Sequence, residues 1–114
     1  MKLMLNSAAI IVSSEEGVNF YKSLGFKEAN RVIRKEMHDE LIFLSNGELE
    51  LRLYKDNTHP IRNRKPESLG IRYLTFSVEN LDSFKGAEIK EDKDGRFIFL
   101  NDPDGQPVQI REKR

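Results

Sequence analysis

The chain has 114 residues, enough for one compact domain whose core two half-length modules would have to share. Nineteen basic and nineteen acidic residues cancel without gathering in a tail, so we expect neither a nucleic acid nor a membrane surface as partner. The absence of cysteine excludes disulfides and thiol chemistry. No apolar run approaches the roughly 20 residues of a membrane span, and the start of the chain does not form a signal peptide. We therefore expect a cytoplasmic protein.

The first module is predicted to span about residues 5–55 and to begin with a strand, Ser7–Val12, and a helix. Ser13 or Ser14 can cap this helix of about three turns, and Gly25 suits the left-handed position just past its end. The apolar stripe of the helix consists of Val18, Phe20, Tyr21 and Leu24.

More strands complete the first module. The alternation of residues 27–36 predicts one of them. Asn46-Gly47 between two apolar runs indicates a hairpin with a two-residue turn. That turn would pair Leu44 with Leu49 and Phe43 with Glu50. Ile42, Leu44, Leu49 and Leu51 would then share one face of the sheet.

Residues 56–69 carry two prolines and few apolar side chains, which predicts an exposed connector. The second module is predicted over about residues 70–112. Its expected elements are a strand over 70–78, one helical turn around 81–84, a strand near 87–91 and a hairpin over 96–112. Asp102-Pro103-Asp104-Gly105 has the proline and glycine placement of a tight turn.

The second module repeats the first. Segments 7–12, 21–28 and 41–44 match 73–78, 84–91 and 97–100, with a three-residue deletion that shortens the second helix. Leu49-Glu50-Leu51-Arg52 returns as Val108-Gln109-Ile110-Arg111, which places Gln109 where the first copy has Glu50. Matches in the same order indicate a duplicated fold.

Each predicted sheet has an apolar face, towards the helices, and a polar face. The polar faces would carry Ser7, Ala9, Glu50, Arg52 and Tyr54 in the first module and Tyr73, Thr75, Ser77, Gln109 and Arg111 in the second. A solvated outer face is the ordinary explanation of such a pattern. The duplication favours one curved sheet whose polar side lines a small-molecule site.

Two motifs make this layout more specific. They are Phe20-Tyr21-x-x-Leu24-Gly25-Phe26 at the first helix end, and Asp102-Pro103-Asp104-Gly105 with the alternating strand after it. Together with the duplication they resemble the vicinal oxygen chelate superfamily, which includes glyoxalase I, the bleomycin-resistance proteins and the extradiol dioxygenases. The resemblance implies an α+β fold within one domain of residues 1–114. Two βαβββ modules would form a curved, cup-shaped mixed sheet with helices on its convex face. It also implies a homodimer, in which the connector is long enough for the chains to exchange modules.

In metal-bearing members of the superfamily the four ligands come from the first and last strands of the modules. By position these are Ser7, Glu50, Tyr73 and Gln109. Only Glu50 is a common ligand type, because neutral hydroxyls and amides are poor ligands for Zn²⁺, Ni²⁺ or Mn²⁺. His38 and His59 fall in or beside predicted loops without a second ligand at suitable spacing. We therefore expect no metal and no other cofactor, and hence no Lewis-acid chemistry.

Glu50 has two interpretations. Beside Phe43 it could act as a general base, whereas an ion pair with Arg52 or Arg111 would keep it structural; we favour the ion pair. The two arginines could clamp a carboxylate or phosphate, or simply form a solvated pair. Tyr73 offers a ring for stacking and a hydroxyl donor.

The sequence thus predicts a non-catalytic protein that binds an anionic or zwitterionic small molecule, as in the bleomycin-resistance branch. The predicted ligand-binding residues are Ser7, Phe43, Glu50, Arg52, Tyr73, Thr75, Gln109 and Arg111. No nucleophile with a histidine partner is found, and no catalytic residue is assigned. The alternatives are a divergent metal-dependent lyase, isomerase or dioxygenase of the same superfamily, and a structural module whose cup is filled by its own side chains.

Overall fold

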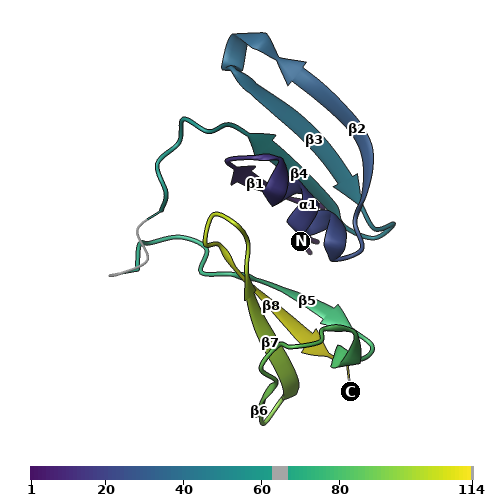
Figure 1. The fold of residues 1–114 in the computed structure, drawn as a ribbon. Coiled ribbons are helices and arrows are strands. Elements are labelled where there is room, and N and C mark those ends of the chain that lie inside the picture. The colour runs from purple at the N-terminus through teal and green to yellow at the C-terminus, as the bar shows by residue number, and fades with distance from the viewer. Residues whose placement is uncertain (63–66, 114) are drawn as a thin grey trace. The chain divides into compact units, whose positions relative to one another are not determined.

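The computed structural model describes residues 1–62 and 67–113. The chain divides into two compact units, Met1–Pro60 and Ile61–Arg114, which we call module 1 and module 2. Each module holds one four-stranded mixed sheet, as the separate arrows of Figure 1 show. The expected connector contains the boundary between the units, and its residues 63–66 lie outside the described residues.

Module 1 has the element order of a βαβββ unit. Its elements are β1 (Ser7–Val12), α1 (Glu15–Ser23), β2 (Lys27–Arg34), the 3-10 turn η1 (Lys35–Met37), β3 (Asp39–Ser45) and β4 (Glu50–Lys55). The sheet order is β1-β4-β3-β2, with β1 parallel to β4 and the other pairs antiparallel. The α+β prediction is confirmed for this half of the chain.

The helix α1 begins and ends where the sequence indicates. Ser14 is its N-cap, although its side chain makes no capping hydrogen bond, and Gly25 beyond its end has a φ of +100°. Val18 and Tyr21 are fully buried on the inner side of α1. Gly17 is needed for close packing, because a Cβ there would lie 2.7 Å from the Cβ of Val12 on β1.

The β3–β4 hairpin has a wider turn than predicted. Ser45 pairs with Glu50 and Leu44 with Leu51, so residues 46–49 form the loop, and the expected pairing of Leu44 with Leu49 is wrong. The Asn46 side chain stabilises the wider loop, since its Oδ1 accepts hydrogen bonds from two backbone N–H groups of that loop. A shift of two residues keeps every side chain on its predicted face.

Module 2 has a shorter first half. Its elements are β5 (Leu74–Val78), the 3-10 turn η2 (Leu81–Ser83), β6 (Lys90–Asp92), β7 (Gly95–Asn101) and β8 (Pro107–Glu112). The sheet order is β5-β8-β7-β6, the same arrangement as in module 1. The predicted shortening of the second helix to a single turn is confirmed. Strand β5 starts at Leu74 rather than at Gly70, so Tyr73 lies just before it.

Apolar side chains form a core on one face of each sheet. The fully buried members are Val12, Val18, Tyr21, Ile42, Leu44, Leu51 and Leu53 in module 1, and Leu81, Ile98 and Val108 in module 2. In the part of the chain that the structure describes, no helix is long and apolar enough to span a membrane.

The strand pairing corrects the alignment of the two copies at their last strands. Val12 and Val78 end equivalent first strands, because the carbonyl of each accepts a hydrogen bond from the residue that follows the last strand of its module. Lys55 lies opposite Val12, and Glu112 lies opposite Val78. These pairs fix which residues of β4 and β8 correspond.

Counting back from those pairs makes Arg52 the counterpart of Gln109 and Glu50 the counterpart of Pro107. The neighbouring strands agree, since Phe43 pairs with Arg52 and Phe99 with Gln109. The equivalence of Glu50 with Gln109 drawn from the sequence is therefore wrong by two residues. A shift of two preserves the apolar and polar alternation, so the repeated pattern alone cannot detect it.

Candidate functional site

The polar face of the module 1 sheet is organised in rows that cross β1, β4 and β3. The rows are Ser7–Glu50–Ser45, Ala9–Arg52–Phe43 and Ile11–Tyr54–Leu41. These rows bring together the predicted site residues of module 1, which come from three neighbouring strands.

Arg52 is the central charged group of this face. Its Nε donates to Glu50 Oε1 at 2.6 Å, and its guanidinium carbon lies 5.4 Å from the centre of the Phe43 ring. The bond to Glu50 raises the pKa of Arg52, which keeps the guanidinium cationic. The preferred interpretation of Glu50, an ion pair with Arg52, is thus observed.

The polar face of the module 2 sheet has equivalent rows across β5, β8 and β7. They are Thr75–Gln109–Phe99 and Ser77–Arg111–Phe97, and Pro107 pairs with Asn101 at the turn end of the hairpin. Tyr73 stands just before β5 at that same end. Three of the predicted residues, Thr75, Gln109 and Arg111, therefore lie side by side.

Gln109 is the most enclosed polar residue of this face, with only 5% of its surface exposed. Its Oε1 accepts hydrogen bonds from Thr75 Oγ1 at 2.9 Å and from Arg111 Nε at 3.3 Å. Because the arginine nitrogen can only donate, these bonds orient the amide. Among the described residues nothing accepts a hydrogen bond from Gln109 Nε2, so this donor remains for a ligand.

Arg111 is held by groups that the sequence did not indicate. Its terminal nitrogens donate to both carboxylate oxygens of Asp92, at 3.2 and 2.6 Å, and its guanidinium carbon lies 4.6 Å from the centre of the Phe97 ring. The bond to Asp92 raises the pKa of Arg111. Asp92 escaped prediction because the strand that carries it has only three residues and little apolar pattern.

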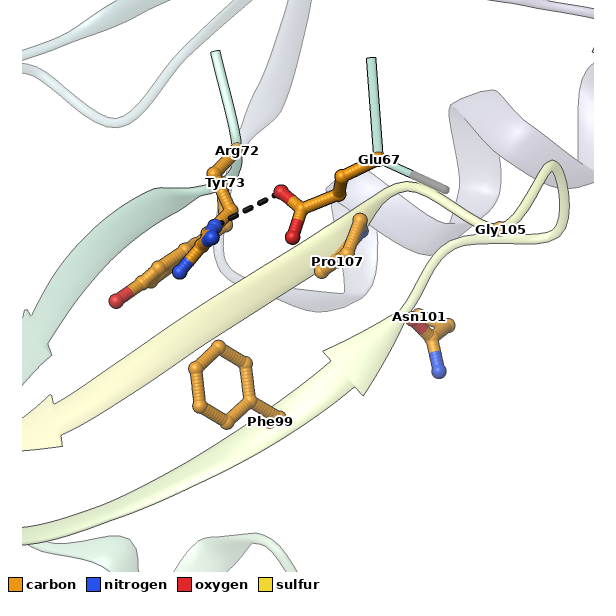
Figure 2. A pocket seen from close by; sticks show the side chains of 7 residues that line it. All are labelled: Glu67, Arg72, Tyr73, Phe99, Asn101, Gly105 and Pro107. Atoms are coloured by element: carbon orange, nitrogen blue, oxygen red, sulfur yellow. Dashed lines mark hydrogen bonds and ion pairs between the residues drawn. The ribbon is translucent and has the colours of Figure 1, made fainter. Parts of the chain in front are cut away.

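A pocket of about 380 Å³ opens at the turn end of the module 2 face. We call it the β8 hollow. Its residues, drawn in Figure 2, are the apolar or small Tyr73, Phe99, Gly105 and Pro107 and the polar Glu67, Arg72 and Asn101. The rings of Tyr73 and Phe99 meet at an angle of 61° with their centres 5.0 Å apart. Of these residues only Tyr73 was predicted; the alternation of β7, which turns Phe99 to the polar face, was the available signal for Phe99.

Comparison with known proteins identifies the family. No family model matches the chain. YwkD of Bacillus subtilis, an uncharacterized protein, is 32% identical over 123 residues, which cover 96% of each chain. The solved structure of a glyoxalase family protein from Enterococcus faecalis has 28% identity and a TM-score of 0.79 over 97% of each chain. The chain belongs to the vicinal oxygen chelate superfamily.

Two further proteins are similar to the chain, one over part of its length and one at low sequence identity. YaeR of Escherichia coli, also uncharacterized, is 34% identical over 79 residues, and the match spans 60% of this chain and 61% of YaeR. FosX, a fosfomycin resistance protein of Listeria monocytogenes solved with Mn(II), covers 100% of this chain and 95% of its own. At 15% identity and a TM-score of 0.71, FosX shares the fold alone.

The corrected register changes the donors at the metal positions of the superfamily. With Arg52 as the counterpart of Gln109 and Glu50 as the counterpart of Pro107, the last-strand positions are either Arg52 and Gln109 or Glu50 and Pro107. A guanidinium and a proline offer no side-chain acceptor to a cation, and Ser7, Tyr73 and Gln109 are neutral, so either set with Ser7 and Tyr73 contains at most one carboxylate. Within residues 1–62 and 67–113 no group of three or more His, Cys, Asp or Glu side chains could hold a metal ion. Neither donor set fits the divalent cation of the metal-bearing members.

Proposed function

We propose that this protein binds a small organic anion or zwitterion on the polar side of its sheets, without a metal ion and without catalysing a reaction. The observation that carries the proposal is Arg52 at the position equivalent to Gln109 on the last strands. A guanidinium recognises a carboxylate or phosphonate through paired, charge-assisted hydrogen bonds. It therefore supplies the positive charge that a metal ion would otherwise supply to such a ligand.

The two arginines of the polar faces are held in similar ways. Arg52 lies over Phe43 and Arg111 over Phe97, and each has a carboxylate at one edge. Contact with a ring and an anchoring carboxylate limit the rotamers of the side chain, so less entropy is lost when it binds a ligand. Their side chains remain 43% and 26% exposed and are therefore accessible.

The other predicted site residues complement this charge. In module 1, Ser7 offers a hydroxyl group on the face that carries Arg52. In module 2, Tyr73 and Thr75 offer hydroxyl groups, and Gln109 offers its amide nitrogen, on the face that carries Arg111. Glu50 anchors Arg52, and it could also attract the ammonium group of a zwitterion. We propose a small molecule and a second copy of the chain as the partners of this protein.

The test is a thermal-shift comparison on chelator-treated protein with benzoate, phenylphosphonate and succinate as probes. We expect at least one probe to stabilise the wild type, and Arg52→Gln or Arg111→Gln to reduce the shift. Arg96→Gln is the matched control because Arg96 precedes Phe97 on β7 and points to the opposite face of the same sheet.

Metal analysis of the untreated protein separates this proposal from the metalloenzyme alternative. Stoichiometric divalent metal that is lost on Glu50→Ala would overturn the proposal and favour the enzyme. Stabilisation by none of the anions would favour a structural module instead.

A further inference from the structure

We infer that the β8 hollow takes a planar aromatic ring, so that a ligand bound on the polar face of module 2, which also carries Arg111, is an aromatic anion. The anionic part of this statement rests on the proposed function. The aromatic part rests on the hollow alone.

The walls of the hollow are two aromatic rings set at an angle. Phe99 keeps 44% of its surface exposed; on the sheet face it pairs with Gln109, and its ring centre lies 5.8 Å from that of Phe97. The Phe99 ring contacts that of Tyr73 edge to face and forms an angled apolar corner with it. Figure 2 draws the two side chains above and below the β8 ribbon. Aromatic rings prefer edge-to-face or offset contacts, so a third ring placed there can contact both walls favourably.

The floor of the hollow is apolar and unobstructed. Pro107 begins β8 there, and as a proline it offers no backbone N–H for a polar ligand. Gly105, at the end of the turn, has a φ of +84°, and apart from its two chain neighbours no residue has an atom within 4 Å of the place where its Cβ would stand. The turn therefore leaves this side of the hollow open.

The size of the hollow limits what can enter. A volume of about 380 Å³ lies near the lower end of the range for small-molecule pockets, roughly 300–1,000 Å³. A single substituted ring suits this volume better than a large fused system.

The polar rim carries no net charge. Arg72 donates to Glu67 at 2.8 Å, and both side chains are well exposed, at 72% and 46%. Within the described part of the chain, the Tyr73 hydroxyl and the Asn101 amide make no hydrogen bond. Both groups can therefore form hydrogen bonds with a polar substituent of the bound ring. Because the rim has no net charge, it does not favour an anionic ligand over a neutral one.

The test compares ligands that differ only in the ring. Benzoate and cyclohexanecarboxylate have the same charge, and phenol and cyclohexanol form a neutral pair. Titration of ¹⁵N-labelled full-length protein should show that each aromatic probe binds about three to ten times more tightly than its saturated partner. The amide shifts should centre on Phe99, Asn101 and Gly105.

Phe99→Leu keeps an apolar wall but removes the ring, and it should abolish the preference for aromatic probes. Phe20→Leu is the matched control, because Phe20 makes a similar edge-to-face pair with Tyr21, also 5.0 Å between centres, on helix α1. An unchanged preference in Phe99→Leu would overturn the inference.

The outcomes also separate the two proposals. Equal binding of benzoate and cyclohexanecarboxylate would overturn the aromatic inference and leave anion binding in place. Binding of phenol but of neither acid would support the aromatic hollow and overturn anion binding. Binding of no probe would overturn both.

Discussion

Gly17 is the residue at which α1 comes closest to β1. A helical glycine is normally less stable than alanine by about 1 kcal/mol, so Gly→Ala substitutions in helices usually stabilise. Here a Cβ would lie 2.7 Å from the Cβ of the buried Val12. We therefore expect Gly17→Ala to lower the free energy of unfolding by about 1–3 kcal/mol, as overpacking does.

Urea unfolding measures this effect, with Asn19→Ala as the control at an exposed position of the same helix. A Gly17→Ala protein as stable as the wild type would show that α1 and β1 are not so closely packed.

Arg31 on β2 holds a charge network together on the side of module 1 that carries α1. It donates to Glu15, Glu28 and Glu40 at 2.8 Å, and Lys55 also reaches Glu15, at 3.0 Å. These bonds lower the pKa of Glu15 and of Glu28 from 4.5 to about 2, with the bond to Arg31 as the largest cause in each case.

The stability of the protein should depend on pH through this network. Because the folded-state pKa values are lowered, the network contributes fully above about pH 4.5 and loses its contribution as the pH falls towards 2. The groups are partly exposed, so we expect Arg31→Gln to cost only about 1–2 kcal/mol at pH 7 and almost nothing near pH 2.

The measurement is the free energy of unfolding in urea across this pH range. Arg72→Gln, which breaks one well-exposed pair, should leave the pH dependence unchanged. If the unfolding free energy of Arg31→Gln changed with pH in parallel with that of the wild type, the network would not have this role.

At the scale of elements, the two hairpins contrast in how their turns are held. In the β7–β8 turn the Asp102 side chain accepts hydrogen bonds from the N–H groups of Asp104 and Gln106, and Asp102 is only 3% exposed. In the β3–β4 turn Asn46 accepts two similar bonds, but it is exposed. Burial should make the first turn more sensitive to substitution.

We therefore expect Asp102→Ala to cost about 1–3 kcal/mol of unfolding free energy, since it removes both hydrogen bonds that its buried carboxylate makes within the turn. Asn46→Ala should cost less, because water can replace the lost bonds. The denaturant midpoints of both variants measure the two losses of stability. Equal losses would show that burial does not make the β7–β8 turn more sensitive than the β3–β4 turn.

The two hairpins also show what the sequence could predict. The motif Asp102-Pro103-Asp104-Gly105 predicts its turn correctly, because the Gly105 N–H donates to the Asp102 carbonyl at 2.9 Å. Asn46-Gly47 marks the right place but the wrong loop length. The length of that loop depends on the hydrogen bonds that the Asn46 side chain accepts. Residue preferences at turn positions do not predict these bonds.

At the scale of the whole molecule, the duplication was evident from the sequence, and the element order followed from it. The correspondence of Glu50 with Gln109 was not correct, because strand alternation repeats every two residues and cannot fix a register. The corrected register makes Arg52 the counterpart of Gln109 and Glu50 the counterpart of Pro107, so the two copies do not place acidic groups at equivalent positions. The β8 hollow depends on residues from a loop, a turn and two strands, so no local pattern could indicate it.

Isothermal titration of the protein with benzoate, before and after removal of divalent ions by a chelator, tests most directly whether an arginine replaces the metal. We expect the same dissociation constant in both states, and an increase of about tenfold or more in Arg52→Gln, since a charge-assisted hydrogen bond is worth about 1.5–3 kcal/mol. Binding that disappears with the chelator and returns on addition of Mn²⁺, Ni²⁺ or Zn²⁺ would contradict the account.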